Sequence, residues 1–297
     1  MHCTLCPRMC GVDRSAKVGF CGESETIRAA RAALHFGEEP CISGVRGSGT
    51  VFFSGCTLRC VFCQNYELSQ GGYGQPLTPE QLSDVLLDLQ AQGAHNINFV
   101  TPTHFLPGIR QSAALCGDRL SLPLLCNCGG YERTETVDAC SDLFDVWMPD
   151  LKFCDPTLSL RYLRASDYFD VASRAILRMR AQSGAPQFDG DGMLTRGVLV
   201  RHLVMPGCLK DSLRLIDWLS VNFGPDDLVV SLMSQYLPCG RAGDFPEINR
   251  RVTTYEYRKA ADALADAGFV HCYTQDRAAS SRDYIPEWTG DGLPAGK

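Results

Sequence analysis

From residue 51 onward, the chain alternates short β-like runs with helix-like segments. Such alternation is typical of parallel strands joined by crossover helices. Six units can be counted, with expected strands at residues 51–54, 96–100, 122–126, 144–148, 198–204 and 228–232. A fragment at 269–273 is a candidate terminal strand. Because no topological switch is evident, the pattern favours an α/β fold with an open, partial (β/α)6 barrel of the TIM type over a doubly wound sheet.

Two of the expected helices begin with clear capping signals. Thr78 is a candidate N-cap, with Pro79 in the first helical position and Gln81 placed to close a capping box. Thr253 and Glu256 repeat this arrangement near the end of the chain. These signals fix where the helices begin and support the repeating strand–helix pattern.

Composition excludes several classes of protein. The chain has 297 residues, enough for a large buried core, and a net charge of −6 with no run of basic residues, which disfavours nucleic acid as a main partner. The N-terminus has no apolar signal core, and no stretch contains 18 uninterrupted apolar residues. We therefore expect a soluble, cytoplasmic protein with no membrane partner.

The sixteen cysteines divide unevenly, because seven fall in two tight groups near the N-terminus and nine are scattered. Disulfide frameworks are typical of small secreted domains, so a long chain without an export signal favours metal binding for the two groups. The scattered cysteines suit the ordinary role of small buried side chains.

One group follows the first expected strand directly. Cys56, Cys60 and Cys63 are spaced C-x3-C-x2-C in a predicted loop. Three thiolates can hold three corners of an iron–sulfur cube and leave one iron open to another ligand. The alternatives are a zinc site completed by a distant histidine or cysteine, and three unrelated buried thiols.

This loop resembles the cluster motif of the radical S-adenosylmethionine (SAM) superfamily, including the aromatic Phe62 before the third cysteine. The resemblance implies that a 4Fe-4S cluster chelates SAM through its open iron. One electron, from a donor such as flavodoxin or ferredoxin, then cleaves SAM to methionine and a 5′-deoxyadenosyl radical, which abstracts hydrogen from a substrate. The implied activity is that of a radical SAM oxidoreductase.

The resemblance narrows toward the activating enzymes of glycyl-radical proteins such as pyruvate formate-lyase. Residues 63–65 are similar to their Cys-His-Asn, residues 150–152 to their Asp-Leu-Lys, and residues 201–207 to their Arg-x-x-x-x-Pro-Gly strand, while residues 127–130 stand where they have Asp-Thr-Asn-Gly. The Gly-Gly-Glu stretch that usually meets the SAM amino group is absent, and residues 101–104 take its place. A glycyl-radical protein is the substrate that this resemblance implies.

Polar side chains lie at the carboxyl ends of several expected strands, the side of a barrel that holds active sites. Lys152 suits the methionyl carboxylate or ribose, and Asp150 can accept hydrogen bonds from an ammonium. Thr101 and Thr103 offer hydroxyls. Arg201 lies in an apolar strand and therefore needs a ligand or a buried carboxylate. The candidate cofactor-binding residues are Phe62, Asn65, Thr101, Thr103, Asn127, Asp150, Lys152, Arg201 and Gln235.

The sequence identifies no catalytic residue, because hydrogen abstraction by a radical needs no general base. His104 and His202 are close to candidate segments. A lone histidine is more often a structural residue than a catalyst, so we expect both to be structural.

The second cysteine group comprises Cys3, Cys6, Cys10 and Cys21. Four thiolates predict a closed metal site that holds either tetrahedral zinc or a second iron–sulfur cluster, and the spacing does not decide between them. Zinc would stabilise a segment without a core, whereas a cluster could relay electrons to the SAM site. The remaining alternative is four unligated thiols.

The expected domain organisation has three parts. Residues 1–25 form the N-terminal metal-binding module with its four cysteines, residues 45–275 the radical SAM core barrel, and residues 276–297 a C-terminal tail. Residues 184–192, rich in glycine and aspartate, are expected to form an exposed loop.

Three functions remain open on the sequence. The first is an activase that removes hydrogen from a backbone glycine of a partner protein, and the second is a radical enzyme acting on a small molecule or peptide. The third is an iron–sulfur electron-transfer or metal-binding protein that never cleaves SAM. This last class predicts a fully ligated cluster that SAM does not perturb.

Overall fold

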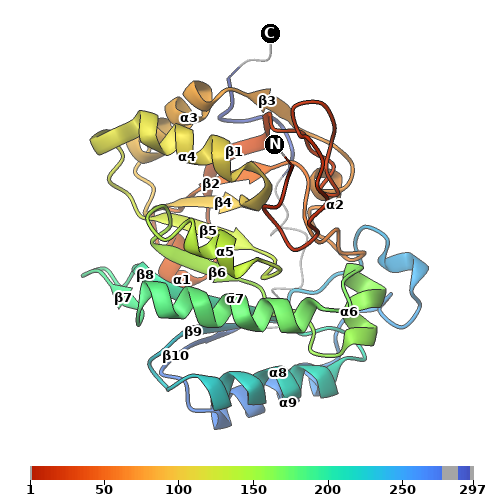
Figure 1. Ribbon diagram of the computed structural model, residues 1–297. Coiled ribbons are helices and arrows are strands. Elements are labelled where there is room, and N and C mark those ends of the chain that lie inside the picture. Colours follow the sequence, from red (N-terminus) through yellow and green to blue (C-terminus); the bar gives the residue numbers. More distant parts are fainter. Residues whose placement is uncertain (1, 276–286, 295–297) are drawn as a thin grey trace.

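The computed structural model describes residues 2–275 and 287–294. Its described strands form one sheet in the order β10-β9-β8-β6-β5-β4-β2-β1-β3, with β7 paired to β8 (Figure 1). The strands are β1 (Ile27–His35), β2 (Ser48–Phe53), β3 (Gln75–Leu77), β4 (Ile97–Val100), β5 (Leu124–Cys128), β6 (Val146–Pro149), β7 (Gln187–Phe188), β8 (Leu194–Leu203), β9 (Val229–Met233) and β10 (His271–Thr274). The α-helices are α1 (Pro40–Ser43), α2 (Tyr66–Ser69), α3 (Pro79–Ala91), α4 (Leu106–Cys116), α5 (Thr134–Asp138), α6 (Pro156–Leu163), α7 (Tyr168–Ser183), α8 (Leu209–Asn222) and α9 (Thr254–Asp266).

From β2 to β10, every neighbouring pair in this order is parallel. The register aligns the strand ends, since Phe52 pairs with Val100 and Val100 with Asn127. The carboxyl ends of the parallel strands therefore share one edge, as a partial barrel requires. The predicted fold class is confirmed, and the seven expected strands appear with their ends displaced by no more than four residues.

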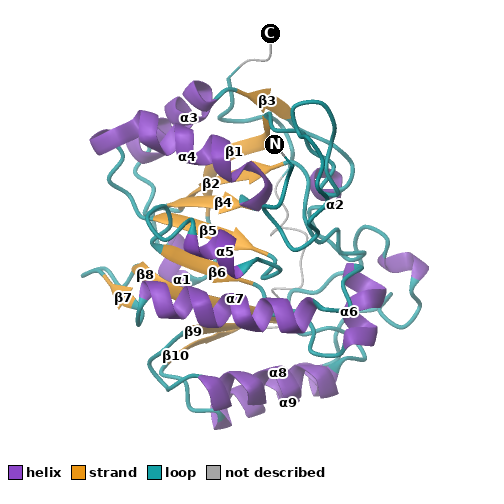
Figure 2. Ribbon diagram, viewed as in Figure 1, coloured by secondary structure: helices purple, strands orange, loops and turns teal. Residues whose placement is uncertain are grey.

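The long helices flank the parallel strands (Figure 2). Their apolar faces are buried: Leu82 and Leu86 of α3 join Phe99 of β4 and Ile109 of α4 in the main core. This packing covers the sheet and leaves the strand ends to build a site.

Both capping boxes form as the sequence predicts. The Thr78 hydroxyl accepts a hydrogen bond from the Gln81 amide at 3.2 Å, and the Gln81 side chain accepts one from the Thr78 amide at 2.9 Å. Thr253 and Glu256 make the same pair of contacts at the start of α9. Each box satisfies amide groups that have no partner inside the helix.

The first strand is a feature that the sequence pattern does not predict. Residues Ile27–His35 form β1, which pairs antiparallel with β2 on one side and β3 on the other. The segment is rich in alanine, a strong helix former, but pairing with β2 and β3 outweighs that preference. The predicted loop at 184–192 is also more ordered than expected, because Gln187–Phe188 form β7 against β8.

The predicted C-terminal tail falls only partly within the structure, because residues 276–286 and 295–297 lie outside the described residues. Its described part packs on the first strand of the sheet. The Ala32 amide donates to the Asp291 carbonyl at 2.9 Å, and the rings of Phe52 and Trp288 lie 5.3 Å apart. Residues 287–294 thus belong to the folded body.

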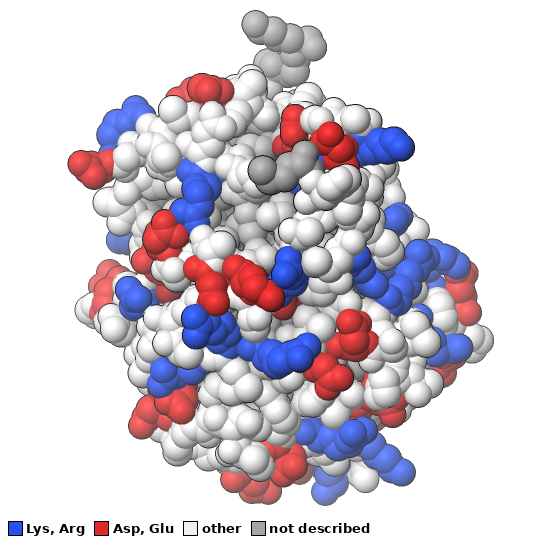
Figure 3. Space-filling model, viewed as in Figure 1, with Lys and Arg blue, Asp and Glu red and all other residues white. Residues whose placement is uncertain are grey.

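On the face shown in Figure 3, basic and acidic side chains are interspersed. Among residues 2–275 and 287–294, none of the helices has both the length and the apolar character that crossing a membrane requires.

Candidate active site

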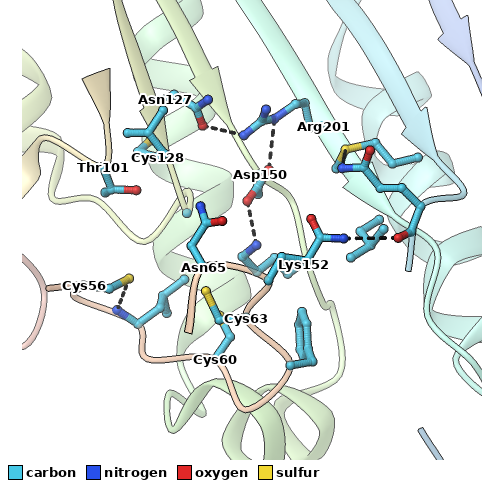
Figure 4. A pocket seen from close by; sticks show the side chains of 18 of the residues that line it. Cys56, Cys60, Cys63, Asn65, Thr101, Asn127, Cys128, Asp150, Lys152 and Arg201 are labelled. Carbon is cyan, nitrogen blue, oxygen red and sulfur yellow. Dashed lines mark hydrogen bonds and ion pairs between the residues drawn. The ribbon is translucent and has the colours of Figure 1, made fainter. Parts of the chain in front are cut away.

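The cysteine loop after β2 forms one wall of a cavity at the carboxyl ends of the strands. Cys56, Cys60 and Cys63 all line this cavity, whose volume is about 210 Å³. Figure 4 shows the loop facing charged side chains that come from the ends of β6 and β8. A single short loop therefore presents three sulfur ligands to the same cavity.

The environment of these sulfurs favours a bound metal group. Burial raises the pKa of Cys63 to about 11, and it raises the pKa of Cys60 further despite the nearby Lys152 ammonium. Both side chains would be neutral thiols at pH 7 without a metal, whereas iron supplies the positive charge that stabilises thiolates. Three thiol ligands on one loop fit a 4Fe-4S cluster with one open iron.

A chain of charged and polar side chains forms the opposite wall. Lys152 donates to Asp150 at 2.6 Å, and the Nε of Arg201 donates to Asp150 at 3.2 Å. Arg201 also donates through Nη1 to Glu38 at 2.9 Å and through Nη2 to the side-chain oxygen of Asn127. The four ionised side chains are only 11–16% exposed.

The charges in this network stabilise one another. Burial alone would raise the pKa of Asp150, but Lys152 and Arg201 together hold that pKa below its usual value. Burial alone would lower the pKa values of Lys152 and Arg201, but Asp150 and the other anionic groups around them together raise both pKa values. All three groups are therefore charged at neutral pH and can orient a zwitterionic ligand such as an amino acid.

The structure brings most of the predicted cofactor-binding residues together. Those that line the cavity are Phe62, Asn65, Thr101, Asn127, Asp150, Lys152, Arg201 and Gln235. Phe62 is buried, and its ring centroid lies 6.1 Å from each of those of Phe153 and Tyr236. Thr103 lies elsewhere: its hydroxyl donates to Glu132 at 2.8 Å in a separate small cavity. Contact of each residue with SAM stays a prediction.

Sequence reasoning missed the contribution of the β1–α1 connection. His35, Gly37 and Glu38 line the cavity. Glu39 is buried beside them, and burial raises its pKa. One feature of the sequence could have pointed to this connection: two adjacent glutamates, Glu38 and Glu39, stand between an apolar run and a proline. Such an acidic pair needs positively charged or hydrogen-bonding partners from elsewhere in the fold.

The two histidines noted in the sequence are structural, as expected. His104 Nε2 lies 2.6 Å from the Ser54 carbonyl, and the His202 ring bridges the Leu151 carbonyl and the Ser212 hydroxyl. Burial lowers the pKa of each to about 4, so both rings are neutral at pH 7. Neither lines the cavity.

The four N-terminal cysteines also lie near one another. A Cβ added at Gly19 would lie 3.4 Å from the sulfurs of both Cys10 and Cys21, and Cys3 contacts Cys10. In the described part of the chain, no three His, Cys, Asp or Glu side chains converge as binding of a single metal ion requires. The closed metal site at these four cysteines stays a prediction.

Comparisons with known proteins agree with this geometry. The family model described as the Radical SAM superfamily matches residues 50–186. Uncharacterized protein MJ0674 of Methanocaldococcus jannaschii is 30% identical over 273 residues, which cover 88% of this chain and 73% of that protein.

Two solved structures share the fold at low sequence identity. Streptococcus suis SuiB bound to S-adenosylmethionine matches with a TM-score of 0.51 and 12% identity, over 74% of this chain and 48% of SuiB. The C140A mutant of spore photoproduct lyase matches with a TM-score of 0.51 and 12% identity, over 83% of this chain and 79% of the lyase. This chain therefore spans about half the length of SuiB and most of the lyase.

The match to the family covers the whole cysteine loop, most of β2, and β4, β5 and β6, which carry that loop and much of the cavity wall. The similarity to MJ0674 extends over 88% of the chain. The chain therefore belongs to the radical SAM superfamily and is an enzyme whose cofactors are a 4Fe-4S cluster and S-adenosylmethionine.

Proposed function

We propose that this enzyme removes a hydrogen atom from a backbone glycine of a partner protein, as activating enzymes of glycyl-radical proteins do. When bound, the cluster supplies the electron that cleaves SAM, and the 5′-deoxyadenosyl radical takes the hydrogen. The observation that carries the proposal is the small size of the cavity and its opening to solvent.

A volume of about 210 Å³ is below the roughly 300–1,000 Å³ of typical ligand pockets. The cofactors would therefore take most of the enclosed space, and the substrate would present its hydrogen at the mouth. An extended peptide can do so, and glycine has no side chain to hinder its approach.

The residues around the cavity would orient SAM rather than exchange protons. Lys152 offers its ammonium group to a carboxylate, and Asp150 offers oxygens to an ammonium group. Arg201 holds Asp150 in place from the neighbouring strand. Because the pKa values of these groups favour their charged forms, we expect them to keep these roles across the neutral range.

A small polar molecule is the second candidate substrate. The observation that favours it is Glu38, a carboxylate on the cavity wall at a position unlike the Gly-Gly-Glu stretch of the activases. Paired with Arg201, this carboxylate could bind an amine-bearing substrate beside the cofactor.

Deuterium transfer separates the two candidates. The enzyme, reconstituted with iron and sulfide without oxygen, is reduced in the presence of SAM and given extracts of its host grown on α-deuterated glycine. The extracts are divided into macromolecular and small-molecule fractions, and the Cys60→Ala variant is the control. We expect deuterium in 5′-deoxyadenosine with the macromolecular fraction, accompanied by a glycyl-radical signal in electron paramagnetic resonance.

Label transfer from the small-molecule fraction alone would reject the glycine proposal in favour of the second candidate. If neither fraction transfers label while 5′-deoxyadenosine still forms, the hydrogen does not come from a glycine and the glycine proposal is rejected.

A further inference from the structure

We propose that Cys3, Cys6, Cys10 and Cys21 bind a second iron–sulfur cluster that passes electrons to the SAM-cleaving cluster. This inference holds for any substrate and so does not depend on the glycine proposal. It rests on three features of residues 2–25: the grouping of the sulfurs, the lack of any other core, and the contact with the Cys56 loop.

The four cysteines are linked by short contacts. Cys10 and Cys21 approach the same side of Gly19, where a Cβ would contact both sulfurs at 3.4 Å. Cys3 contacts Cys10, and Cys6 lies within electrostatic range of both Cys3 and Cys21. Each half of the module closes through tight backbone turns, such as the 3.0 Å bond from the Gly22 amide to the Gly19 carbonyl.

Little else holds this module together from within. Among residues 2–25, the only buried apolar side chains are Cys6 and Cys21. A segment that lacks an apolar core needs a metal centre or a neighbouring surface to fold stably. Buried cysteines at the centre of such a segment are the expected place for that metal.

Proximity to the SAM-cluster loop favours a cluster over zinc. Zinc has no redox chemistry, so it would serve only to hold the module together. An iron–sulfur cluster also takes four thiolates, and it can accept and release an electron. The hydrogen bond from the Cys56 amide to the Cys21 carbonyl puts the module where such an electron is used.

The module lies directly against the SAM-cluster loop, beside the ends of the central strands (Figure 1). The Cys56 amide donates to the Cys21 carbonyl at 3.1 Å, so a ligand from each group is joined through one hydrogen bond. Gly55 has a positive φ of 78°, and a Cβ there would lie 2.8 Å from the Cys21 carbonyl. Glycine at this position therefore permits the close approach.

Arg8 fastens the module to the same loop. Its guanidinium donates to the carbonyls of Thr57 and Leu163, both at 2.9 Å, and lies 4.2 Å from the centre of the Phe20 ring. These contacts fix the two cysteine groups relative to each other, which rapid electron transfer requires.

The proposed relay transfers one electron for each SAM molecule that is cleaved. A donor protein carrying reduced flavin or an iron–sulfur centre gives one electron to the N-terminal cluster, which passes it to the SAM-cleaving cluster. That electron breaks the bond between sulfur and the 5′ carbon of SAM, giving methionine and the 5′-deoxyadenosyl radical. No further oxidant or reductant is consumed before hydrogen abstraction.

The first experiment measures metal content in chains purified without oxygen and reconstituted with iron and sulfide in the presence of equimolar zinc. A triple variant with Cys56→Ala, Cys60→Ala and Cys63→Ala should retain iron and sulfide, with an electron paramagnetic resonance signal on reduction. Adding Cys6→Ser and Cys10→Ser should abolish that signal. If the triple variant binds zinc instead, or neither metal, the proposed cluster does not exist.

The second experiment tests the relay in the otherwise intact enzyme. Cys6→Ser is compared with Cys272→Ser, which removes an exposed cysteine outside both groups. With reduced flavodoxin as donor, Cys6→Ser should lower the SAM cleavage rate at least tenfold, while dithionite, a small reductant, should restore most of it. Equal rates for both variants with flavodoxin would reject the relay even if the cluster is present.

Discussion

Arg201 and Glu38 form a buried ion pair, with 2.9 Å between Nη1 and Oε2, that joins β8 to the connection before the barrel. Both side chains are nearly inaccessible, at 12% and 11% exposed. Glu38 also accepts hydrogen bonds from Asn98 at 3.0 Å and from Asn127 at 3.2 Å. Through these contacts, Glu38 links the β1–α1 connection to β4, β5 and β8 at the active-site edge.

Breaking this pair should destabilise the protein strongly. Arg201→Met leaves Glu38 without its cation and leaves Asp150 with Lys152 alone. Removing one partner of a buried pair costs about 3–5 kcal/mol. Urea unfolding of the protein without oxygen gives the free energy of unfolding. Adding Glu38→Gln should recover part of the loss, because the uncompensated charge is removed. If Arg201→Met unfolds at the wild-type urea concentration, the pair contributes little.

Lys152 should act on SAM and not on cluster assembly. Its ammonium group lies 2.6 Å from Asp150, and the residue lines the cavity. A protonated lysine amine does not bind iron in an iron–sulfur cluster, whose ligands are cysteine thiolates. Lys152→Ala and Asp150→Ala should keep the cluster absorbance while weakening SAM binding about tenfold or more, which corresponds to about 1.4 kcal/mol. Equilibrium binding of SAM and the rate of 5′-deoxyadenosine formation check this. Wild-type affinity and rate in both variants would show that these side chains do not contact SAM.

The sequence predicted this part of the site because its signals are local. Asp150 and Lys152 follow directly after an apolar run, and a residue at the end of a parallel strand faces the shared carboxyl edge. Glu38 could not be found in the same way. It reaches the cavity only because β1 pairs antiparallel with β2, and that pairing depends on contacts between segments, not on the alanine-rich pattern of residues 27–35.

Thr103 is a residue that the strand pattern predicted to face the cavity but that points elsewhere in the structure. Its position at the end of β4 suggested a cofactor contact, but the chain turns there into a short 3-10 helix over Thr103–Phe105. This turn directs the hydroxyl toward Glu132 instead of the cavity. A turn of one or two residues decides where a side chain points, and the strand pattern carries no information about it.

The three cysteines of the loop should be equally necessary. Cys56→Ala, Cys60→Ala or Cys63→Ala each removes one of three thiolate ligands and should abolish SAM cleavage together with the iron of that cluster. Iron and sulfide analysis and 5′-deoxyadenosine formation are measured on the same samples. Cys154→Ala, a half-buried cysteine outside both groups, is the matched control. A loop variant that keeps full cleavage would contradict the assignment.

Glu132 should make stability depend on pH. Burial raises its pKa to about 8, although hydrogen bonds from Thr103 and Cys128 lower it. Because the pKa is higher in the folded state than in the unfolded chain, the neutral carboxyl is favoured by folding. This contribution is fully present below the unfolded pKa of 4.5 and is lost as the pH rises to about 8, with a slope of up to about 1.4 kcal/mol per pH unit.

Glu132→Gln should remove this dependence, because the amide stays neutral and its oxygen can still accept the 2.8 Å hydrogen bond from Thr103. The informative quantity is the difference in free energy of unfolding between the variant and the wild type from pH 5 to 9. We expect it to increase in favour of the variant up to about pH 8 and then to level off. Glu135→Gln, at an exposed carboxylate three residues away, is the control and should show no such rise. A difference for Glu132→Gln that stays constant with pH would mean that Glu132 is already ionised at pH 5 in the folded protein.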